Sequence, residues 1–110
     1  PMQEKLKDFT IIDTHLHLGY LSGLNLPLEP DSAIMAQYKK YGVSKAIFSH
    51  HYAISSVDFG LECTLSALEK YKGSFFAYLV YNPNFERRSL EIIKEYISSE
   101  SVAGVKIHPS

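Results

Sequence analysis

The stretch that decides the fold is Ile11-Ile12-Asp13-Thr14-His15-Leu16-His17-Leu18-Gly19. Apolar and polar residues alternate in it with a period of two, which is typical of a β-strand with one apolar face. On a regular strand, Asp13, His15 and His17 share the other face. The Cα atoms of the two histidines are then about 6.5 to 7 Å apart, so both imidazoles can reach one ion. A catalytic zinc has three protein ligands, and the third must come from elsewhere.

Three more strands and three helices are indicated after this stretch. Apolar runs bounded by Gly or Pro predict strands, and apolar residues spaced by three and four predict helices. The last helix is expected to turn Leu90, Ile93 and Ile97 inward. Residues 20–28 predict a loop that either covers a pocket or packs its leucines on the body. The predicted strands are Phe9–Leu18, Val43–Ser49, Phe75–Tyr81 and Val102–Pro109, and the predicted helices are 29–41, 56 or 58 to 72, and 87–98.

The order β-α-β-α-β-α-β, with nearly continuous apolar strands, predicts a parallel sheet covered by helices. Two architectures use this unit, an open doubly wound sheet and a (β/α)8 barrel. A nucleotide-binding open sheet carries a glycine-rich turn after its first strand, and this sequence has none there. Instead, histidines stand at or near the ends of the first, second and fourth strands. In a barrel these ends converge on one mouth, so the pattern favours the barrel.

Composition narrows the classes of function. The 110 residues suit one domain, and a net charge of −1 with interspersed signs argues against nucleic acid or an anionic membrane as a partner. No apolar run is long enough to span a bilayer, and the first residues lack the apolar segment of a secretory signal. Cys63 is the only cysteine, and its place in an apolar helix stripe favours packing over nucleophilic chemistry. A cytoplasmic location is therefore expected.

Four motifs in this order resemble the amidohydrolase superfamily, and most closely its amidohydrolase 2 group, which includes metal-dependent decarboxylases. They are Ile11–Gly19, Val43–Ser49, Val80–Asn84 and Gly104–Pro109. The resemblance implies a (β/α)8 barrel that holds zinc or a similar divalent metal, with His15 and His17 as its first two ligands.

The resemblance also implies residues that the 110-residue sequence does not contain. They are a His from the second half of the barrel and a strand-eight Asp that serves as proton shuttle, and both are expected beyond Ser110. Because the sequence shows only four strands, we expect residues 1–110 to form the N-terminal half of such a barrel, either a fragment or a natural half. The catalytic proton acceptor is therefore not assigned to any residue of this sequence.

Other residues are candidates for the same site. Asp13 could orient a ligating histidine or pair with a cation. Lys106 shares a strand face with His108, and both are candidates for substrate binding. The resemblance leaves two readings for this lysine. It pairs with a carboxylate or polarises a substrate carbonyl, or it is carboxylated and bridges two metals as in some branches. Of the neighbours His50 and His51, at most one can face the mouth, and His50 is taken as a substrate-binding candidate.

The sequence thus predicts a metal-dependent hydrolase in which an activated water attacks an amide, ester or lactone carbonyl of a small molecule. Decarboxylation on the same scaffold is the alternative reaction. The alternative of another class is a non-catalytic half-barrel that acts as an assembly module. An unclosed half exposes two sheet edges, so the expected partner is a missing C-terminal half or a second copy of the chain.

Overall fold

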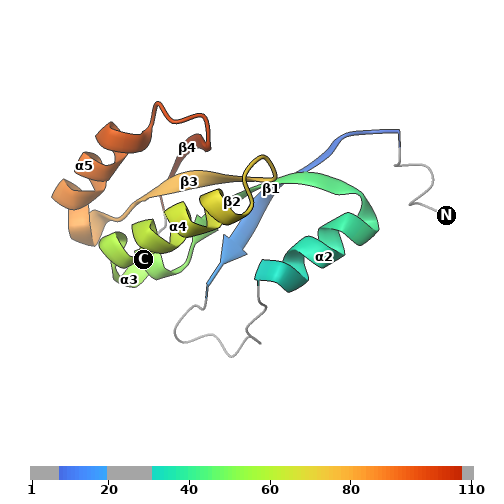
Figure 1. The fold of residues 1–110 in the computed structure, drawn as a ribbon. Coiled ribbons are helices and arrows are strands. Elements are labelled where there is room, and N and C mark those ends of the chain that lie inside the picture. Colours follow the sequence, from blue (N-terminus) through green and yellow to red (C-terminus); the bar gives the residue numbers. More distant parts are fainter. Residues whose placement is uncertain (1–7, 20–30, 108–110) are drawn as a thin grey trace.

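Strands and helices alternate along the chain (Figure 1). The structure is a computed structural model, and it describes residues 8–19 and 31–107. The predicted loop at 20–28 lies outside the described residues. The elements are β1 (Ile11–Leu18), α2 (Asp31–Tyr41), β2 (Val43–His50), α3 (Tyr52–Ser55), α4 (Val57–Lys70), β3 (Phe75–Tyr81), a 3-10 turn η1 (Pro83–Phe85), α5 (Glu86–Tyr96) and β4 (Val102–Ile107). The α/β prediction is confirmed, with small shifts of the element ends and one added short helix, α3.

The four strands form one sheet in the order β1-β2-β3-β4, and every neighbouring pair is parallel. Each crossover therefore moves the chain one strand further in the same direction. A doubly wound sheet reverses this direction at a switch point, and the described strands contain no such reversal. The arrangement is that of consecutive β/α units, with β1 and β4 as the two edges.

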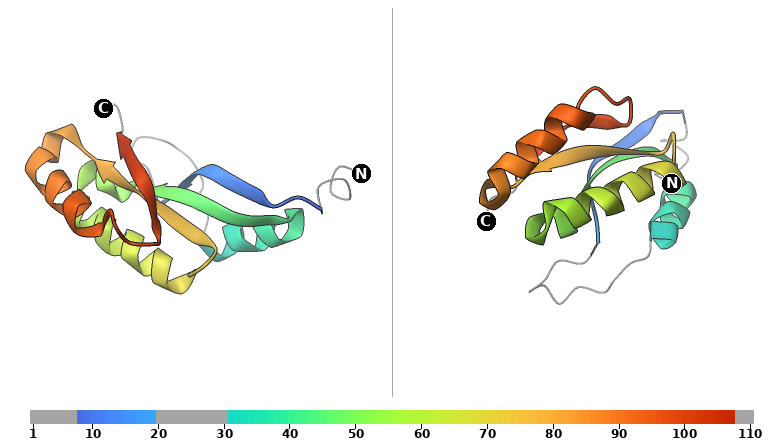
Figure 2. Two further views of the ribbon diagram at one scale, coloured as in Figure 1. Left: turned by 90° about the horizontal axis from the view of Figure 1, so that it is seen from above. Right: turned by 60° about the vertical axis from the view of Figure 1, so that its left-hand side comes forward.

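The main core lies between one face of this sheet and the helices. Phe48 of β2 and Phe75 of β3 are fully buried there, with ring centroids 5.7 Å apart. Ala46 and Ala77 occupy alternate positions on the same two strands, because side chains of a strand alternate between faces. Helix α4 contributes buried residues to this cluster, and α2 packs against it with partly buried ones. Figure 2 shows the helices following one another along this face, here called the helix face.

Helix α5 packs on a second cluster and differs from its predicted orientation. Ser89 and Ile92 are its buried residues, whereas Leu90 and Ile97 are 47% and 43% exposed. The reason is a polar contact: the Ser89 hydroxyl accepts a hydrogen bond of 3.1 Å from the backbone N–H of Asn82. This bond fixes the rotation of α5 about its axis. Of the three residues predicted to face inward, Ile93 packs against the second cluster, whereas the prediction is wrong for Leu90 and Ile97.

The short helix α3 is tied to the end of β3. The buried Asn82 side chain donates hydrogen bonds to the carbonyls of Ala53 (3.1 Å) and Ile54 (2.8 Å), which lie in the last turn of α3. Gly60 of α4 lies against Ala53, where a Cβ would come within 2.5 Å of backbone atoms. Asn82, directly after β3, thus holds α3 in place against the end of that strand.

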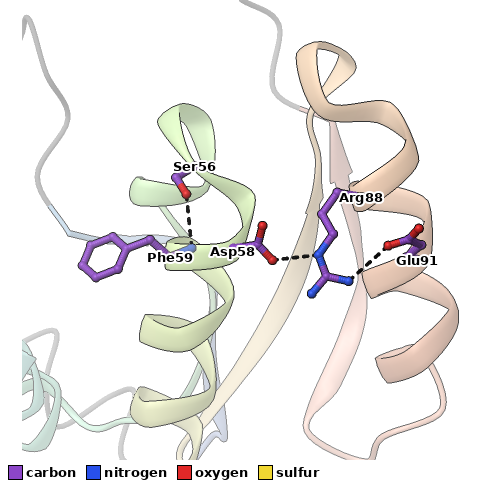
Figure 3. A network of polar contacts seen from close by, with 5 residues as sticks. All are labelled: Ser56, Asp58, Phe59, Arg88 and Glu91. Atoms are coloured by element: carbon purple, nitrogen blue, oxygen red, sulfur yellow. Dashed lines mark hydrogen bonds and ion pairs between the residues drawn. The ribbon is translucent and has the colours of Figure 1, made fainter.

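The N-terminus of α4 is capped and linked to α5, as Figure 3 shows. The Ser56 hydroxyl accepts a hydrogen bond from Phe59 N–H (3.3 Å), which satisfies one of the unpaired donors at a helix start. Arg88 of α5 contacts Asp58 at 2.7 Å and Glu91 at 3.3 Å. These ion pairs are exposed, so solvent and salt screen them and they add little to the stability of the fold.

Candidate functional site

Strand β1 does not alternate regularly through the two predicted metal ligands. Its pairing with β2 joins Asp13 to Ala46 and Leu16 to Phe48, so β1 takes three steps while β2 takes two. The extra residue makes a β-bulge, which changes the phase of the strand. Because Ala46 and Phe48 lie on the helix face, Asp13 and Leu16 lie there too. Regular alternation predicts that Asp13 shares a face with the two histidines. The bulge makes this prediction wrong, because Asp13 lies on the helix face.

The bulge separates Asp13 from His15 and His17, which lie together on the opposite side of the sheet, here called the inner face. Their Nε2 atoms are 3.0 Å apart, and the rings meet edge to face with centroids 4.9 Å apart. His15 is exposed and His17 is half-buried. Both rings thus aim the same nitrogen at one point near the carboxyl end of β1, as the sequence predicts for two ligands of one ion.

Two residues from the end of β2 hold His17. The hydroxyl of the buried Ser49 lies 3.0 Å from His17 Nδ1, and the His51 ring stacks on the His17 ring at 4.4 Å between centroids and 21° between planes. His51 in turn donates from Nδ1 to the Gly19 carbonyl at 3.2 Å. A hydrogen bond to one ring nitrogen fixes the tautomer and leaves the other nitrogen defined as a ligand or donor.

Lys106 reaches the same point from the far edge of the sheet. Its Nζ lies 3.4 Å from His15 Nε2, although β4 and β1 are separated by β2 and β3. In a flat sheet the two edge strands are about 14 Å apart, at 4.7–4.9 Å for each strand spacing. The contact therefore reflects a sheet that curls around its inner face. We call His15, His17, Ser49, His51 and Lys106 the histidine cluster.

A pocket of about 310 Å³ adjoins the histidine cluster. It lies between the two edges of the sheet, and the described residues that line it offer imidazole, ammonium, hydroxyl and phenol groups but no acid. The lining residues are Thr14, His15, Tyr78, Val105, Lys106 and Ile107.

His50 lies apart from the histidine cluster, although it was a predicted substrate-binding residue. It pairs with Leu18 on the helix face and is 7% exposed. Its Nδ1 accepts a 3.4 Å hydrogen bond from Tyr52 N–H. Burial, and secondarily the charge of His51, lowers the pKa of His50 to about 4, so the ring is neutral at pH 7. Gly19 lies directly on this ring, and a Cβ there would approach it to 2.5 Å.

Asp13 is held by two donors on the helix face. It accepts hydrogen bonds from His15 N–H (2.9 Å) and from the Tyr38 hydroxyl of α2. Sequence reasoning missed Tyr38 and also missed Ser49. Ser49 could have been found from its position two residues before His51 at the end of a strand, whereas no local signal connects Tyr38 with β1.

Two of the sequence predictions concern the end of the chain. His108, a predicted substrate-binding residue, and Ser110 both lie outside the described residues, which end at Ile107. The proton-shuttle Asp was not predicted within this sequence, so the structure does not test its position. At the end of β4 the described residues bring Lys106 into the histidine cluster, so imidazoles and an ammonium group lie together. The position of a catalytic carboxylate stays a prediction.

The two imidazoles fit part of a metal site. Two nitrogens bound to one tetrahedral zinc at 2.0–2.1 Å are about 3.3 to 3.4 Å apart, a few tenths of an ångström more than the observed 3.0 Å. Within residues 8–19 and 31–107, no group of three or more His, Cys, Asp or Glu side chains is arranged to hold an ion. His15 and His17 would therefore be the contribution of these residues to such a site, and further ligands must lie outside them.

Comparisons of the chain with protein-family models, with curated proteins and with solved structures find no match. None of the helices in the described part of the chain is long and apolar enough to cross a membrane. The functional conclusion therefore depends on the residues and on the geometry of the histidine cluster.

Proposed function

We propose that the chain supplies the metal-binding half of an amidohydrolase-type hydrolase with a (β/α)8 barrel. The observation that carries the proposal is the 3.0 Å approach of His15 Nε2 to His17 Nε2 at the carboxyl end of a parallel strand. Active sites of (β/α)8 enzymes lie at that end of the strands. The sequential strand order and the curl of the sheet support the barrel, and the His-x-His spacing supports the amidohydrolase type.

Each residue of the histidine cluster has a role in this proposal. His15 and His17 would hold the metal through Nε2, and the Ser49 hydroxyl, 3.0 Å from His17 Nδ1, would fix the ring of His17. When bound, a divalent ion such as zinc supplies Lewis acidity, which polarises a substrate carbonyl and makes water nucleophilic near neutral pH. The stacked His51 shields one side of His17 from solvent. A carboxylate that the described residues do not bring to the cluster would take up the proton.

Lys106 indicates the kind of small molecule that fits beside the imidazoles. Its ammonium group lies on the pocket wall, and none of the lining residues that the structure describes is an acid that would neutralise it. A substrate carboxylate or carbonyl oxygen would meet this charge within the pocket. Because hydrolysis and decarboxylation both accept an acidic substrate, decarboxylation stays the alternative reaction.

The alternative to an enzyme is a non-catalytic half-barrel that acts as an assembly module. The exposed apolar residues of the edge strand β4 support this alternative. Val105 and Ile107 are 42% and 65% exposed, so β4 carries apolar side chains that nothing in the described chain covers. In the enzyme proposal, a further four-stranded half or a second copy pairs with this edge. Size-exclusion chromatography with light scattering distinguishes a self-associating chain from a monomer that needs a different partner.

Metal affinity of point variants tests the hydrolase proposal. We expect one zinc or cobalt ion per chain, and at least a tenfold loss of affinity for His15→Ala and for His17→Ala, because each removes one of two ligands. Ser49→Ala should weaken binding by about tenfold, since outer hydrogen bonds orient ligands. His50→Asn is the matched control and should bind as the wild type does, because His50 lies on the helix face. Equal affinity in all four variants would contradict the assignment of the ligands.

A further inference from the structure

The bulge in β1 is what places His15 on the inner face. Asp13 is paired with Ala46, on the helix face, and Leu16 with Phe48, on the same face. Between them Thr14 and His15 occupy the space of one residue of β2. Without the bulge, the strand would carry Asp13 and His15 on the same face, and His15 would share the helix face with Asp13. The direction of the His15 ring therefore depends on whatever holds the bulge in place.

Both oxygens of the Asp13 carboxylate help to hold the bulge in place. Oδ1 accepts a 2.9 Å hydrogen bond from the His15 backbone N–H, a donor inside the bulge where the regular ladder is disrupted. Oδ2 accepts a hydrogen bond from the hydroxyl of Tyr38. The carboxylate thus connects the backbone of one predicted ligand to a helix that comes later in the chain.

Tyr38 is itself fixed by the body of the protein. Its ring packs against the main core as one of the partly buried residues of α2. Burial and the hydrogen bond to Asp13 both raise the pKa of the Tyr38 hydroxyl, so it stays a proton donor across the physiological range. The position of α2 on the sheet is thereby transmitted through one hydroxyl and one carboxylate to the bulge.

We propose that Tyr38 and Asp13 form a positioning pair that fixes the β1 bulge and so keeps His15 on the inner face, where its Nε2 meets that of His17. Neither residue touches the ion or a substrate in this role. The pair acts by keeping His15 on the inner face, because without the bulge this residue would lie on the helix face with Asp13. Its effect on metal affinity depends on the proposed function, but its effect on the geometry of the histidines does not.

The test uses the metal-free full chain and three variants. Tyr38→Phe removes the hydroxyl and keeps the ring, Asp13→Ala removes both acceptors, and Asp13→Asn keeps an oxygen for the His15 N–H. Tyr41→Phe is the matched control, because Tyr41 is on the same helix and 52% exposed. Amide hydrogen exchange of His15, relative to that of the core residue Phe48, reports on the bulge. The ¹⁵N shifts of the His15 and His17 imidazoles at fixed pH report on the ring contact.

We expect His15 exchange to accelerate by about tenfold relative to Phe48 in Tyr38→Phe and by more in Asp13→Ala, with changed imidazole shifts in both. Asp13→Asn should recover most of the protection, and Tyr41→Phe should resemble the wild type. Where the wild type binds metal, the first two variants should also lose about tenfold in affinity. Unchanged His15 exchange and unchanged imidazole shifts in Asp13→Ala would overturn the positioning role. A wild type that binds no metal but shows the expected exchange would overturn only the proposed function.

Discussion

His50 and His51 are adjacent in the chain, yet the sheet gives them opposite surroundings. His51 stacks on His17 at the inner face, whereas His50 is buried on the helix face beneath Gly19. Strand alternation alone predicts that the two differ, but it does not say which one faces the site. Ala46 and Phe48 are buried on the helix face, and His50 follows Phe48 by two residues, so strand alternation places His50 on that face as well.

The buried His50 should make the protein less stable in mild acid. Its folded pKa of about 4 lies below the ordinary value of about 6.5, so the unfolded chain takes up the proton first as the pH falls. Its contribution is intact above pH 6.5 and declines from there to about pH 4, by about 1 to 2 kcal/mol at pH 5 once solvent screening is allowed for. Urea denaturation of the wild type and of His50→Asn at pH 7 and pH 5 measures it. The wild type should lose more stability between the two pH values than the variant, and parallel losses would rule out His50 as the cause.

The proximity of His15 and His17 could be predicted from their spacing of two on a strand, and the structure brings their rings together. The neighbours of this pair could not be predicted in the same way. The bulge that separates Asp13 from them depends on Tyr38, which is 25 residues away along the chain. Lys106 is 91 residues from His15, and only the curl of the sheet makes them neighbours.

At the scale of elements, the type of each long helix and strand follows from its pattern, but the rotation of a helix does not. In α5, the stripe Leu90, Ile93 and Ile97 fits an amphipathic helix as well as the observed stripe does. The contact of Ser89 with the backbone of Asn82 decides between them. A buried hydrogen bond of a small polar residue is not visible in a hydrophobic pattern, so the sequence alone could not settle this face.

The contact between α3 and α4 gives a test at the same scale. Gly60→Ala would place a Cβ 2.5 Å from the backbone of Ala53, which α3 can relieve only by moving. Alanine favours a helix over glycine by about 1 kcal/mol, but overpacking costs about 1 to 3 kcal/mol, so we expect net destabilisation. Thermal and urea denaturation measure the change, with the exposed Ser66→Ala in the same helix as control. A Gly60→Ala variant more stable than the wild type would show that the two helices are not packed as described.

At the scale of the whole molecule, the curl of the sheet is the property on which the site depends. The two edge strands contribute His15 and Lys106 to one cluster, and a flat sheet of the same order would separate them. The strand order could be anticipated from the β/α alternation, because right-handed crossovers with short connections place consecutive strands side by side. The degree of curling could not, since it depends on twist and packing summed over all four strands.

Replacing Lys106 tests the curl in solution. Lys106→Met should shift the ¹⁵N signal of His15 Nε2, because the ammonium donor at 3.4 Å is lost. Lys45→Met is the control, since Lys45 lies on β2 near the Phe76 ring instead. The His15 signal should stay unchanged in the control. Equal spectra for Lys106→Met and the wild type would mean that the two edges of the sheet do not approach each other.

The central claim is that His15 and His17 bind one ion together, and X-ray absorption at the zinc edge of the zinc-loaded chain tests it most directly. The account predicts two imidazole nitrogens at about 2.0 to 2.1 Å, one fewer in His15→Ala, and no sulfur ligand. A spectrum of the wild type without imidazole scattering, or with a sulfur neighbour at about 2.3 Å that assigns the metal to Cys63, would contradict it.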